Sequence, residues 1–168
     1  SRNRKPILEV LRPLLPSDGT VLEIASGTGE HAAYFAGELP HLNWQPSNFE
    51  EEHLTSTEAW RLHTGTPNFK PVVKLDASSD HWPVETADYE HVPIRSLFNA
   101  NMIHISPWAV TLGLFDGAGR ILSAGDLMIL YGPYKFNGEH TASSNVKFDQ
   151  WLKDMDPDFG VRDLDVVT

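Results

Sequence analysis

The sequence predicts an α/β protein whose core is an open, doubly wound and mostly parallel β-sheet. Short apolar runs typical of buried strands alternate along the chain with segments whose apolar residues recur at helical spacing. Polar or Gly-rich turns separate these segments, which is the pattern of strands joined by crossover helices. The 168 residues suffice for one domain, but a closed barrel of strands and helices requires roughly 250. We therefore expect a single domain over residues 1–168.

The N-terminal part of the chain is expected to form a helix, a strand and a second helix. Apolar residues between positions 7 and 15 recur at helical spacing, and the Pro-Ser-Asp-Gly sequence at 16–19 ends that helix. Residues 20–25 form a short apolar run typical of a buried strand, and the turn at 26–29 holds two glycines. Residues 30–39 return to helical spacing.

The same alternation continues to the end of the chain. The further predicted strands cover residues 42–46, 69–75, 94–100 and 127–131. The further predicted helices cover residues 50–62, 108–121 and 143–152. Because crossovers between parallel strands are right-handed, we expect these helices to cover both faces of the sheet and to give three layers.

Composition and charge exclude several classes of protein. Apolar residues make up 40% of the chain, which is enough to offset the entropy of ordering it, so disorder is excluded as the default state. No apolar run reaches the roughly 18 residues of a membrane span, and no apolar leader follows a charged start. The net charge of −10 has the wrong sign for a protein that follows a phosphate backbone. We therefore expect neither a nucleic acid nor a membrane as partner.

Cysteine and histidine usage limits the chemistry further. The absence of Cys excludes disulfides, thiol catalysis and Cys-ligated zinc, and it fits a cytoplasmic protein. None of the eight His forms an i, i+4 pair beside a carboxylate, so no metal site is predicted. The one basic cluster consists of Arg2, Arg4, Lys5 and Arg12. It is either a solvated end or a surface that faces an anionic small ligand.

The turn after the first predicted strand is the main candidate for a ligand site. In open α/β sheets ligands bind outside the carboxyl ends of the strands, where glycines let the backbone approach them and the next helix offers unpaired N–H groups. Gly27, Gly29 and Ala32 satisfy the spacing of a dinucleotide-binding turn, which alone is weak evidence. Glu23 would repel a pyrophosphate and suits a ligand that carries an ammonium group and no phosphate. A Gly-rich turn that binds nothing is the alternative.

The same residues carry a resemblance to a known class of enzymes. The spacing of Glu23, Ala25, Gly27 and Gly29 resembles the S-adenosylmethionine loop of class I methyltransferases, with Ala25 in place of the more usual first Gly. Segments along the whole chain resemble the methyltransferase-like 26 family, a small class I group of unassigned substrate. These segments are Arg2-Asn3 before Pro6-Ile7-Leu8, Val21-Leu22-Glu23-Ile24-Ala25-Ser26-Gly27-Thr28-Gly29, Trp44-Gln45-Pro46-Ser47, Asn101-Met102-Ile103-His104-Ile105-Ser106-Pro107, Tyr131-Gly132-Pro133-Tyr134 with Asn137-Gly138, Ser144-Asn145 with Phe148-Asp149, and Gly160-x-Arg162-Asp163.

The resemblance implies a three-layer, Rossmann-like methyltransferase fold with S-adenosyl-L-methionine as its cofactor. It places Asn48 at the ribose hydroxyls and Asp76 at the adenine amino group, where the Ala77 N–H adds a donor. Asn101 and Met102 would meet the methionine end of the cofactor. The complete set of implied cofactor-binding residues is Arg2, Glu23, Ala25, Ser26, Gly27, Gly29, Asn48, Asp76, Ala77, Asn101 and Met102.

Three of these residues also have a purely structural interpretation. Asp76 could serve as a helix N-cap, and Asn101 could be only a turn residue. Arg2 either meets the cofactor carboxylate or belongs to a solvated N-terminus.

Two departures from the family pattern bear on function. The family usually places an acid where this chain has Asn48, so we expect weaker cofactor binding, or substitution by a neighbour such as Glu50. The family also continues past Thr168 with a helix and a β-hairpin that supplies strands six and seven. We therefore expect the C-terminal end of the domain to be missing and residues 127–131 to form an exposed edge of the sheet.

Residues after the fourth and fifth predicted strands are candidates for chemistry on the substrate. His104 lies next to the implied methyl end, where it is either a general base or a packed, hydrogen-bonded wall. Tyr131, Tyr134 and Asn137 follow the fifth strand, where a substrate pocket would open. Packing alone is the alternative for the two tyrosines.

These features predict an S-adenosylmethionine-dependent methyltransferase that acts on a small molecule by in-line displacement. Positioning and desolvation carry most of such a reaction, so no catalytic triad is required. One alternative is a non-catalytic binding protein of the same fold, which Asn48 and the missing end would suit. The other is an oxidoreductase that holds NAD in the same loop, against which Glu23 argues.

Overall fold

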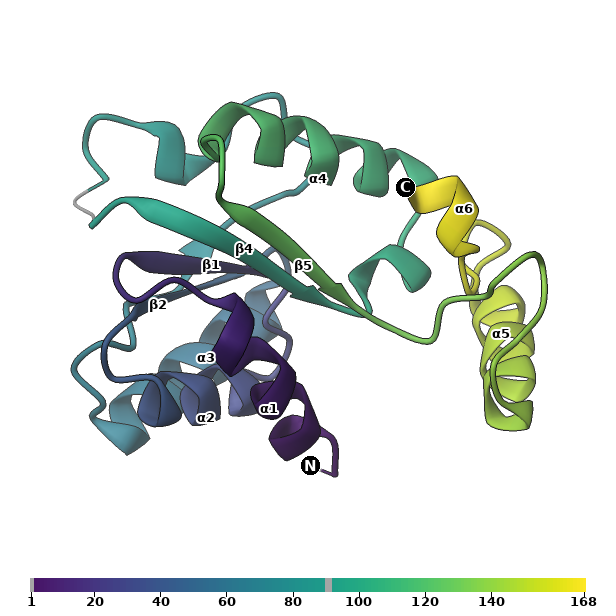
Figure 1. The fold of residues 1–168 in the computed structure, drawn as a ribbon, viewed down its shortest axis with the longest axis horizontal. Helices are drawn as coiled ribbons and strands as arrows, with labels where there is room; N and C mark the ends of the chain where they lie inside the picture. Colours follow the sequence, from purple (N-terminus) through teal and green to yellow (C-terminus); the bar gives the residue numbers. More distant parts are fainter. Residues whose placement is uncertain (1, 90–91) are drawn as a thin grey trace.

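A computed structural model describes residues 2–89 and 92–168 of the protein. Its centre is a sheet of five strands in the order β3-β2-β1-β4-β5 (Figure 1). The strands are β1 (Thr20–Ile24), β2 (Asn43–Asn48), β3 (Val73–Lys74), β4 (Ile94–Ala100) and β5 (Leu127–Tyr131). Every pair of neighbouring strands is parallel. The predicted fold class, a doubly wound sheet without strands six and seven, is thereby confirmed for the described residues.

Helices cover both faces of the sheet, as the alternating pattern predicts (Figure 1). The helices on one face are α1 (Arg4–Leu14), α2 (Glu30–Glu38) and α3 (Glu51–Thr64), and α4 (Trp108–Ile121) covers the other. The short 3-10 helices are η1 (Pro83–Glu85) and η2 (Met102–His104). No helix among the described residues is both long enough and apolar enough to cross a membrane.

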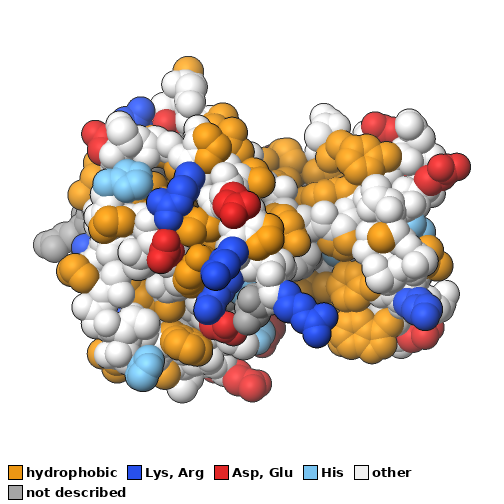
Figure 2. Space-filling model, turned by 60° about the horizontal axis from the view of Figure 1, so that its bottom comes forward, with side chains coloured by type: hydrophobic (Ala, Val, Ile, Leu, Met, Phe, Trp, Pro, Cys, Tyr) orange, Lys and Arg blue, Asp and Glu red, His pale blue; other side chains and the backbone are white. Residues whose placement is uncertain are grey.

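The last part of the chain forms a lobe beside the sheet. It contains α5 (Ser143–Met155) and α6 (Leu164–Val167), which follow β5 and stand beyond the end of that strand (Figure 1). In the space-filling view a cleft separates this lobe, on the right, from the rest of the molecule (Figure 2). The lobe therefore borders the edge of the sheet at which the strands end.

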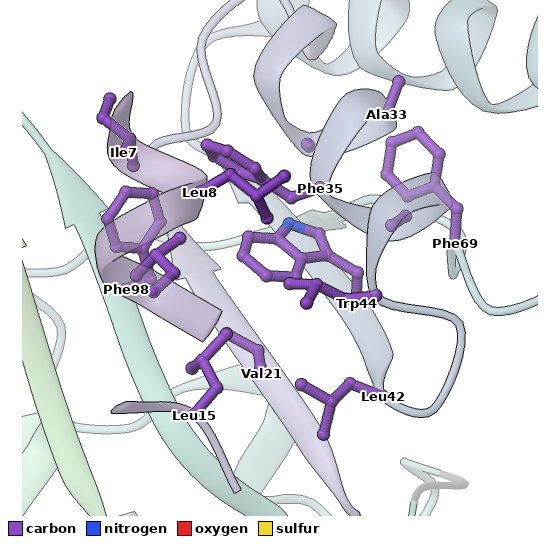
Figure 3. Packing of buried hydrophobic residues seen from close by; sticks show 14 residues of the cluster. Ile7, Leu8, Leu15, Val21, Ala33, Phe35, Leu42, Trp44, Phe69 and Phe98 are labelled. Atoms are coloured by element: carbon purple, nitrogen blue, oxygen red, sulfur yellow. The ribbon is translucent and has the colours of Figure 1, made fainter. Parts of the chain in front are cut away.

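The core beneath α1 and α2 centres on aromatic rings. Trp44 on β2 and Phe98 on β4 are buried, with ring centroids 5.3 and 5.9 Å from the Phe35 ring of α2 (Figure 3). Leu8 of α1 is buried beside the same rings (Figure 3). Burial of each such side chain contributes about 2 kcal/mol. This cluster holds α1 and α2 on the sheet and so positions the turn between β1 and α2.

The predicted strand at 69–75 is the main difference from the expected elements. Within that range only Val73–Lys74 forms a strand, although Lys70 N also donates to Trp44 O at 2.9 Å. Pro71 has no N–H, and its carbonyl accepts a hydrogen bond from the Gln45 side chain at 2.8 Å. The proline therefore interrupts the ladder inside the predicted strand. The short helices η1, η2 and α6 also lie outside the predicted elements, because three or four residues are too few to show a period.

β5 forms one edge of the sheet, as the sequence predicts. Among the described residues it pairs with β4 alone, and Leu127 and Tyr131 at its two ends are exposed. The residues between them are half-buried. The strand therefore presents unpaired backbone groups on its outer side.

Candidate functional site

The carboxyl edge of the sheet is the place where this topology can bind a ligand. The strand order reverses between β1 and β4, because the chain passes from β1 outward through β2 and β3 before it returns to β4. Ligands of open parallel sheets bind outside the carboxyl ends of the strands at such a switch point. The residues that follow β1, β2, β3 and β4 all meet at this edge.

The turn between β1 and α2 is built from left-handed backbone. Ala25, Gly27 and Gly29 have φ values of 56°, 59° and 86°. A Cβ atom at Gly29 would lie 2.6 Å from Thr57 Cα, so the loop packs directly on α3. A Cβ atom at Gly27 would meet nothing within 4 Å. The loop is thus supported by α3 on one side and open on the other.

Asn48, at the end of β2, ties this loop to α3. Asn48 is 2% exposed, and its Oδ1 accepts a hydrogen bond from Gly27 N at 2.8 Å. Its Nδ2 donates to Gly27 O, His53 O and Thr57 Oγ1 at 3.1, 3.2 and 2.9 Å. Both polar atoms of the amide are therefore engaged within the protein. The ribose contact expected from the sequence stays a prediction, and these hydrogen bonds do not favour it.

Glu23 and Ser26 lie behind the loop. Glu23 is 3% exposed, and its carboxyl group accepts a hydrogen bond from Trp44 Nε1 at 2.8 Å. Burial raises the pKa of Glu23 to about 7, although hydrogen bonds from Trp44 and Ser26 act in the opposite direction. Ser26 Oγ also accepts a hydrogen bond from Ser47 N at 3.3 Å. The two side chains brace the ends of β1 and β2, and the contact of Glu23 with a ligand stays a prediction.

A cavity of about 230 Å³ opens beside the loop at the carboxyl edge. The segments that follow β1, β2, β3 and β4 contribute to its lining, together with the first turn of α4. The lining residues are Ile24, Ala25, Phe49, Leu75, Asp76, Ala77, Ser78, Met102 and Val110. The structure thus brings together Ala25, Asp76, Ala77 and Met102, which are predicted cofactor residues. Apolar walls with one carboxylate suit a flat, weakly polar group that carries an amino edge.

Asp76 closes a tight turn after β3. Its Oδ1 accepts hydrogen bonds from Ser78 N at 2.9 Å and from Ser78 Oγ at 2.6 Å. No α-helix begins at this point, so the N-cap alternative for Asp76 does not apply. Its Oδ2 has no hydrogen bond to any residue in the described part of the chain. The turn therefore fixes the carboxylate while leaving one oxygen able to accept from an amino group.

The end of β4 adds a second acceptor to this edge. Asn99 is 1% exposed, and its Nδ2 donates to Ile24 O at 2.9 Å. Its Oδ1 has no hydrogen-bond partner among the described residues. A buried oxygen without a partner costs about 1–3 kcal/mol, so Asn99 is suited to accept from a ligand or from water. Asn101 follows with a φ of 68°, and its N–H donates to Tyr131 O at 2.8 Å, which turns the chain so that Met102 reaches the cavity.

His104 is an anchor for the C-terminal lobe. The residue is fully buried, its Nδ1 accepts a hydrogen bond from Arg162 N at 3.0 Å, and its carbonyl accepts one from Gly160 N at 2.9 Å. Burial, assisted by the charge of Arg162, lowers the pKa of His104 to about 4. A neutral imidazole that accepts at Nδ1 carries its proton on Nε2, so it takes up a further proton only by losing the contact with Arg162. This geometry fits the packed-wall interpretation of His104 better than the general base.

The predicted substrate residues do not line the cavity. Tyr131 is 39% exposed at the end of β5, and Asn137 lies in an exposed turn with a φ of 52°. Tyr134 is half-buried, with its ring centroid 4.7 Å from that of His104, and burial raises its pKa to about 12. The structure therefore groups Tyr134 with His104 and leaves Tyr131, at the end of β5, and Asn137 exposed on the surface.

Arg2 is exposed and lies close to the start of α2. The next residues fix this position, because Asn3 Oδ1 lies 3.2 Å from His31 Nε2 and Arg4 forms an ion pair with Glu30 at 3.5 Å. No contact places Arg2 in the cavity, so its contact with a cofactor carboxylate stays a prediction.

Five lining residues of the cavity are absent from the sequence-based set, and no group of metal ligands was found. The five are Ile24, Phe49, Leu75, Ser78 and Val110. Phe49 directly follows the end of β2 and could have been found from its position after a strand. Val110 is one of several apolar residues on α4, and only the packing of that helix distinguishes it. Within residues 2–89 and 92–168, no cluster of three or more side chains could hold a metal ion.

Several solved structures with the same architecture are methyltransferases. An O-methyltransferase family protein from Burkholderia thailandensis is similar with a TM-score of 0.77 at 11% identity, covering 99% of this chain and 48% of that chain. The apo form of the S-adenosylmethionine-dependent methyltransferase SibL gives 0.71 at 14% identity, with coverages of 97% and 45%. Coclaurine N-methyltransferase bound to N-methylheliamine and SAH gives 0.59 at 15% identity, with coverages of 76% and 35%.

These likenesses show the fold of class I S-adenosylmethionine-dependent methyltransferases. This chain spans less than two thirds of the length of each of the three proteins. A family of sequences also matches, and its description is "Protein of unknown function (DUF938)". That description does not name the methyltransferase-like 26 family, so this finer likeness stays a prediction. Since the match extends over residues 1–168, the chain belongs to the DUF938 family.

Proposed function

We propose that this protein is an S-adenosylmethionine-dependent methyltransferase whose acceptor is a small molecule. The observation that carries the proposal is the cavity at the carboxyl edge of the sheet, where Asp76 and Ala77 lie against apolar walls beside the Gly27 loop. The same edge is the ligand side of every open parallel sheet. The fold that the chain shares with methyltransferases supports the proposal independently.

The residues at this edge fit the cofactor chemically. The free oxygen of Asp76 can accept from the adenine amino group, and the Ala77 N–H can donate to the ring. Gly27 leaves open space where a side chain would stand in the way of a ligand. Asn99 Oδ1, which is buried and has no partner among the described residues, can accept from the hydroxyl or ammonium donors of the cofactor.

The protein's part in the reaction is to position the acceptor and to exclude water. When bound, the cofactor supplies a methyl group on a positively charged sulfur, which an acceptor atom takes by in-line displacement. Met102 provides an apolar wall at the end of the cavity, and the turn at Asn101 holds it there. His104 keeps the C-terminal lobe beside this wall and needs no proton-transfer role. Arg2 is placed in this proposal near the carboxylate of the cofactor.

The choice of a small acceptor rests on charge. The net charge of −10 opposes the approach of DNA or RNA. Of the basic N-terminal residues, Arg4 pairs with Glu30 and Arg12 with Glu38, which leaves little free positive charge for phosphates. A cytoplasmic setting is part of the same proposal.

Calorimetric titration with S-adenosylhomocysteine, S-adenosylmethionine and NAD tests the cofactor assignment. We expect both sulfur compounds to bind and NAD not to bind. Ligand at about 100 times its dissociation constant stabilises the protein by roughly 2.7 kcal/mol, so thermal unfolding gives a second readout. Binding of NAD alone would support the oxidoreductase instead.

Incubation with methyl-labelled S-adenosylmethionine and pools of small molecules tests catalysis. Transfer of label to a small acceptor supports the proposal. Binding of the cofactor with no transfer to any pool would favour a non-catalytic protein of the same fold. Micromolar binding to an oligonucleotide at 150 mM salt would overturn the small-acceptor part.

A further inference from the structure

Gly113, in the first half of α4, packs directly against the backbone of the turn that follows β3. A Cβ atom at this position would lie 2.5 Å from Ala77 O and 2.6 Å from Ser78 Cα. Non-bonded carbon atoms come no closer than about 3.5 Å without repulsion. Because both contacts are with backbone atoms, no side chain can rotate away to make room. Any residue other than glycine at position 113 would therefore displace the turn or the helix.

The turn beside Gly113 carries the groups with which the candidate site can recognise a base. Asp76, Ala77 and Ser78 all line the cavity. Ser78 N and Ser78 Oγ donate to Asp76 Oδ1 at 2.9 and 2.6 Å, so the place of Ser78 sets the direction of the carboxylate. Gly113 thus contacts the residue that orients Asp76.

α4 also supplies part of the cavity wall. Val110 lines the cavity and lies three residues before Gly113, so the two residues are neighbours on one face of the helix. The segment before the turn is held on the sheet, because Leu75 N donates to Asn48 O at 2.9 Å. The width of the cavity between α4 and the turn therefore depends on how closely the helix approaches at Gly113.

Two other glycines of α4 stand apart from the cavity. A Cβ atom at Gly117 would meet the ring of Trp82, at 2.0 Å from Cζ2, and one at Gly119 would meet nothing within 4 Å. Neither glycine is among the residues that line the cavity. Gly119→Ala is the matched control for Gly113→Ala, because it makes the same change in the same helix without a new contact.

We propose that Gly113 is a positioning residue that makes the site selective for a 6-aminopurine base. With α4 packed on the turn, Asp76 presents a fixed acceptor to the amino group, and the Ala77 N–H presents a donor to the adjacent ring nitrogen. A hypoxanthine base carries a carbonyl oxygen in place of the amino group and a protonated ring nitrogen, so both contacts are mismatched. This inference rests on the proposed function and adds to it a specificity-determining residue outside the cavity lining.

Calorimetry with S-adenosylhomocysteine and S-inosylhomocysteine tests the inference on the parent protein, Gly113→Ala and Gly119→Ala. The parent protein should prefer the adenosine compound by about tenfold or more. Gly113→Ala should reduce this preference to about twofold or less, chiefly by weakening the adenosine compound. Gly119→Ala should keep the parent preference. A purely structural role of Gly113 would weaken both compounds equally and leave the preference unchanged.

Two further variants test whether Gly113 acts through Asp76. In Asp76→Asn the amide can either accept or donate, so the preference should already be lost, and the addition of Gly113→Ala should change it no further. Ser78→Ala removes the Oγ contact with Asp76 and leaves the contact of α4 with Ser78 Cα in place. It should lower the preference about threefold. Ser78→Ala keeps the inference testable if thermal unfolding shows that Gly113→Ala does not fold.

Three results would overturn the inference while the cofactor still binds. The first is a parent protein that binds both compounds equally. The second is a folded Gly113→Ala protein that keeps the parent preference or loses it no more than Gly119→Ala does. The third is a Ser78→Ala protein with the full parent preference. Failure of the parent protein to bind either compound would instead reject the proposed function, and this inference with it.

Discussion

Asn48 and Gly27 hold each other by two hydrogen bonds, one in each direction. Gly27 N donates to Asn48 Oδ1 at 2.8 Å, and Asn48 Nδ2 donates to Gly27 O at 3.1 Å. The same Nδ2 also reaches His53 O and Thr57 Oγ1, so one amide connects the end of β2, the loop after β1 and α3. A carboxylate cannot make this set of contacts, because it has no donor.

We therefore expect Asn48→Asp to destabilise the protein and to weaken cofactor binding. In the variant a carboxylate oxygen would face two backbone carbonyls, and a buried polar group that loses its partner costs about 1–3 kcal/mol. The family resemblance by itself leads to the opposite expectation, tighter binding through a charge-assisted hydrogen bond to the ribose. Urea unfolding together with calorimetry on both proteins decides between the two.

Asn43→Asp is the matched control for this substitution. Asn43 begins the same strand, is half-buried, and its side chain makes no hydrogen bond within the described residues. It should change stability by less than about 0.5 kcal/mol. If Asn48→Asp is as stable as the parent protein and binds the cofactor more tightly, residue 48 contacts the ribose. The interpretation of Asn48 as a side chain that only supports the loop at Gly27 would then be wrong.

Alanine at Gly27 and at Gly29 should separate binding from folding. Both positions have positive φ, which costs an alanine about 1–2 kcal/mol. At Gly29 the new Cβ atom also meets the Thr57 backbone at 2.6 Å, so Gly29→Ala should lose about 3 kcal/mol or more of stability. At Gly27 the new Cβ atom meets no other atom of the protein and instead occupies the open side of the loop, where we expect the ligand. Gly27→Ala should therefore also weaken the binding of S-adenosylhomocysteine about tenfold, which corresponds to about 1.4 kcal/mol.

Thermal unfolding and calorimetry on the two alanine variants check this contrast. Equal affinities of Gly27→Ala and the parent protein would show that the open side of the loop does not face the ligand.

Asp76→Asn should weaken S-adenosylhomocysteine binding without loss of stability. An Asn side chain can still accept from Ser78 N and Ser78 Oγ and so preserve the turn. The hydrogen bond from an amino group to a charged carboxylate is stronger than one to a neutral amide, and we expect a loss of about fivefold, or about 1 kcal/mol. Calorimetry measures the loss, with Asp80→Asn in the next exposed turn as control. Equal losses in both variants would assign the effect to net charge alone.

Glu23 and His104 should give opposite pH dependences of stability. The folded-state pKa of Glu23, about 7, lies above its ordinary value of 4.5, so its contribution is present below pH 4.5 and is lost as the pH rises through 7. The folded-state pKa of His104, about 4, lies below 6.5, so its contribution is present above pH 6.5 and is lost as the pH falls through 4. One pKa unit corresponds to about 1.4 kcal/mol, so each group contributes about 3 kcal/mol at most.

Between pH 4.5 and 6.5 the two contributions therefore offset each other. Glu23→Gln removes one of them and leaves the other. Relative to the parent protein, the variant should gain about 2–3 kcal/mol in the free energy of unfolding as the pH rises from 5 to 7. Urea unfolding at half-unit steps of pH measures this difference. Parallel curves for the two proteins would show that Glu23 is not buried in its neutral form.

The fold and part of the site follow from local sequence patterns. Short apolar runs alternate along the chain with segments whose apolar residues recur at helical spacing, and this alternation locates the five strands and the helices between them. The spacing of apolar residues is informative because it reflects which side of each helix or strand is buried. The glycines at 27 and 29 mark the loop, because few other residues adopt left-handed backbone at low cost. Asp76 and Ala77 are found by their position after a strand. Such signals lie within a few residues of each other, and no tertiary information is needed to read them.

Tertiary structure alone supplies the contacts of Glu23, Asn48 and His104. In the sequence each stands at a strand end or in the turn after one, where a ligand contact is a natural interpretation. Folding brings Trp44 onto Glu23, Gly27 and Thr57 onto Asn48, and the backbone of Arg162 onto His104. These partners lie 9 to 58 positions away along the chain, and local periodicity carries no information about them. A polar side chain is satisfied by whichever partner packing supplies, so its role depends on contacts that only the folded chain creates.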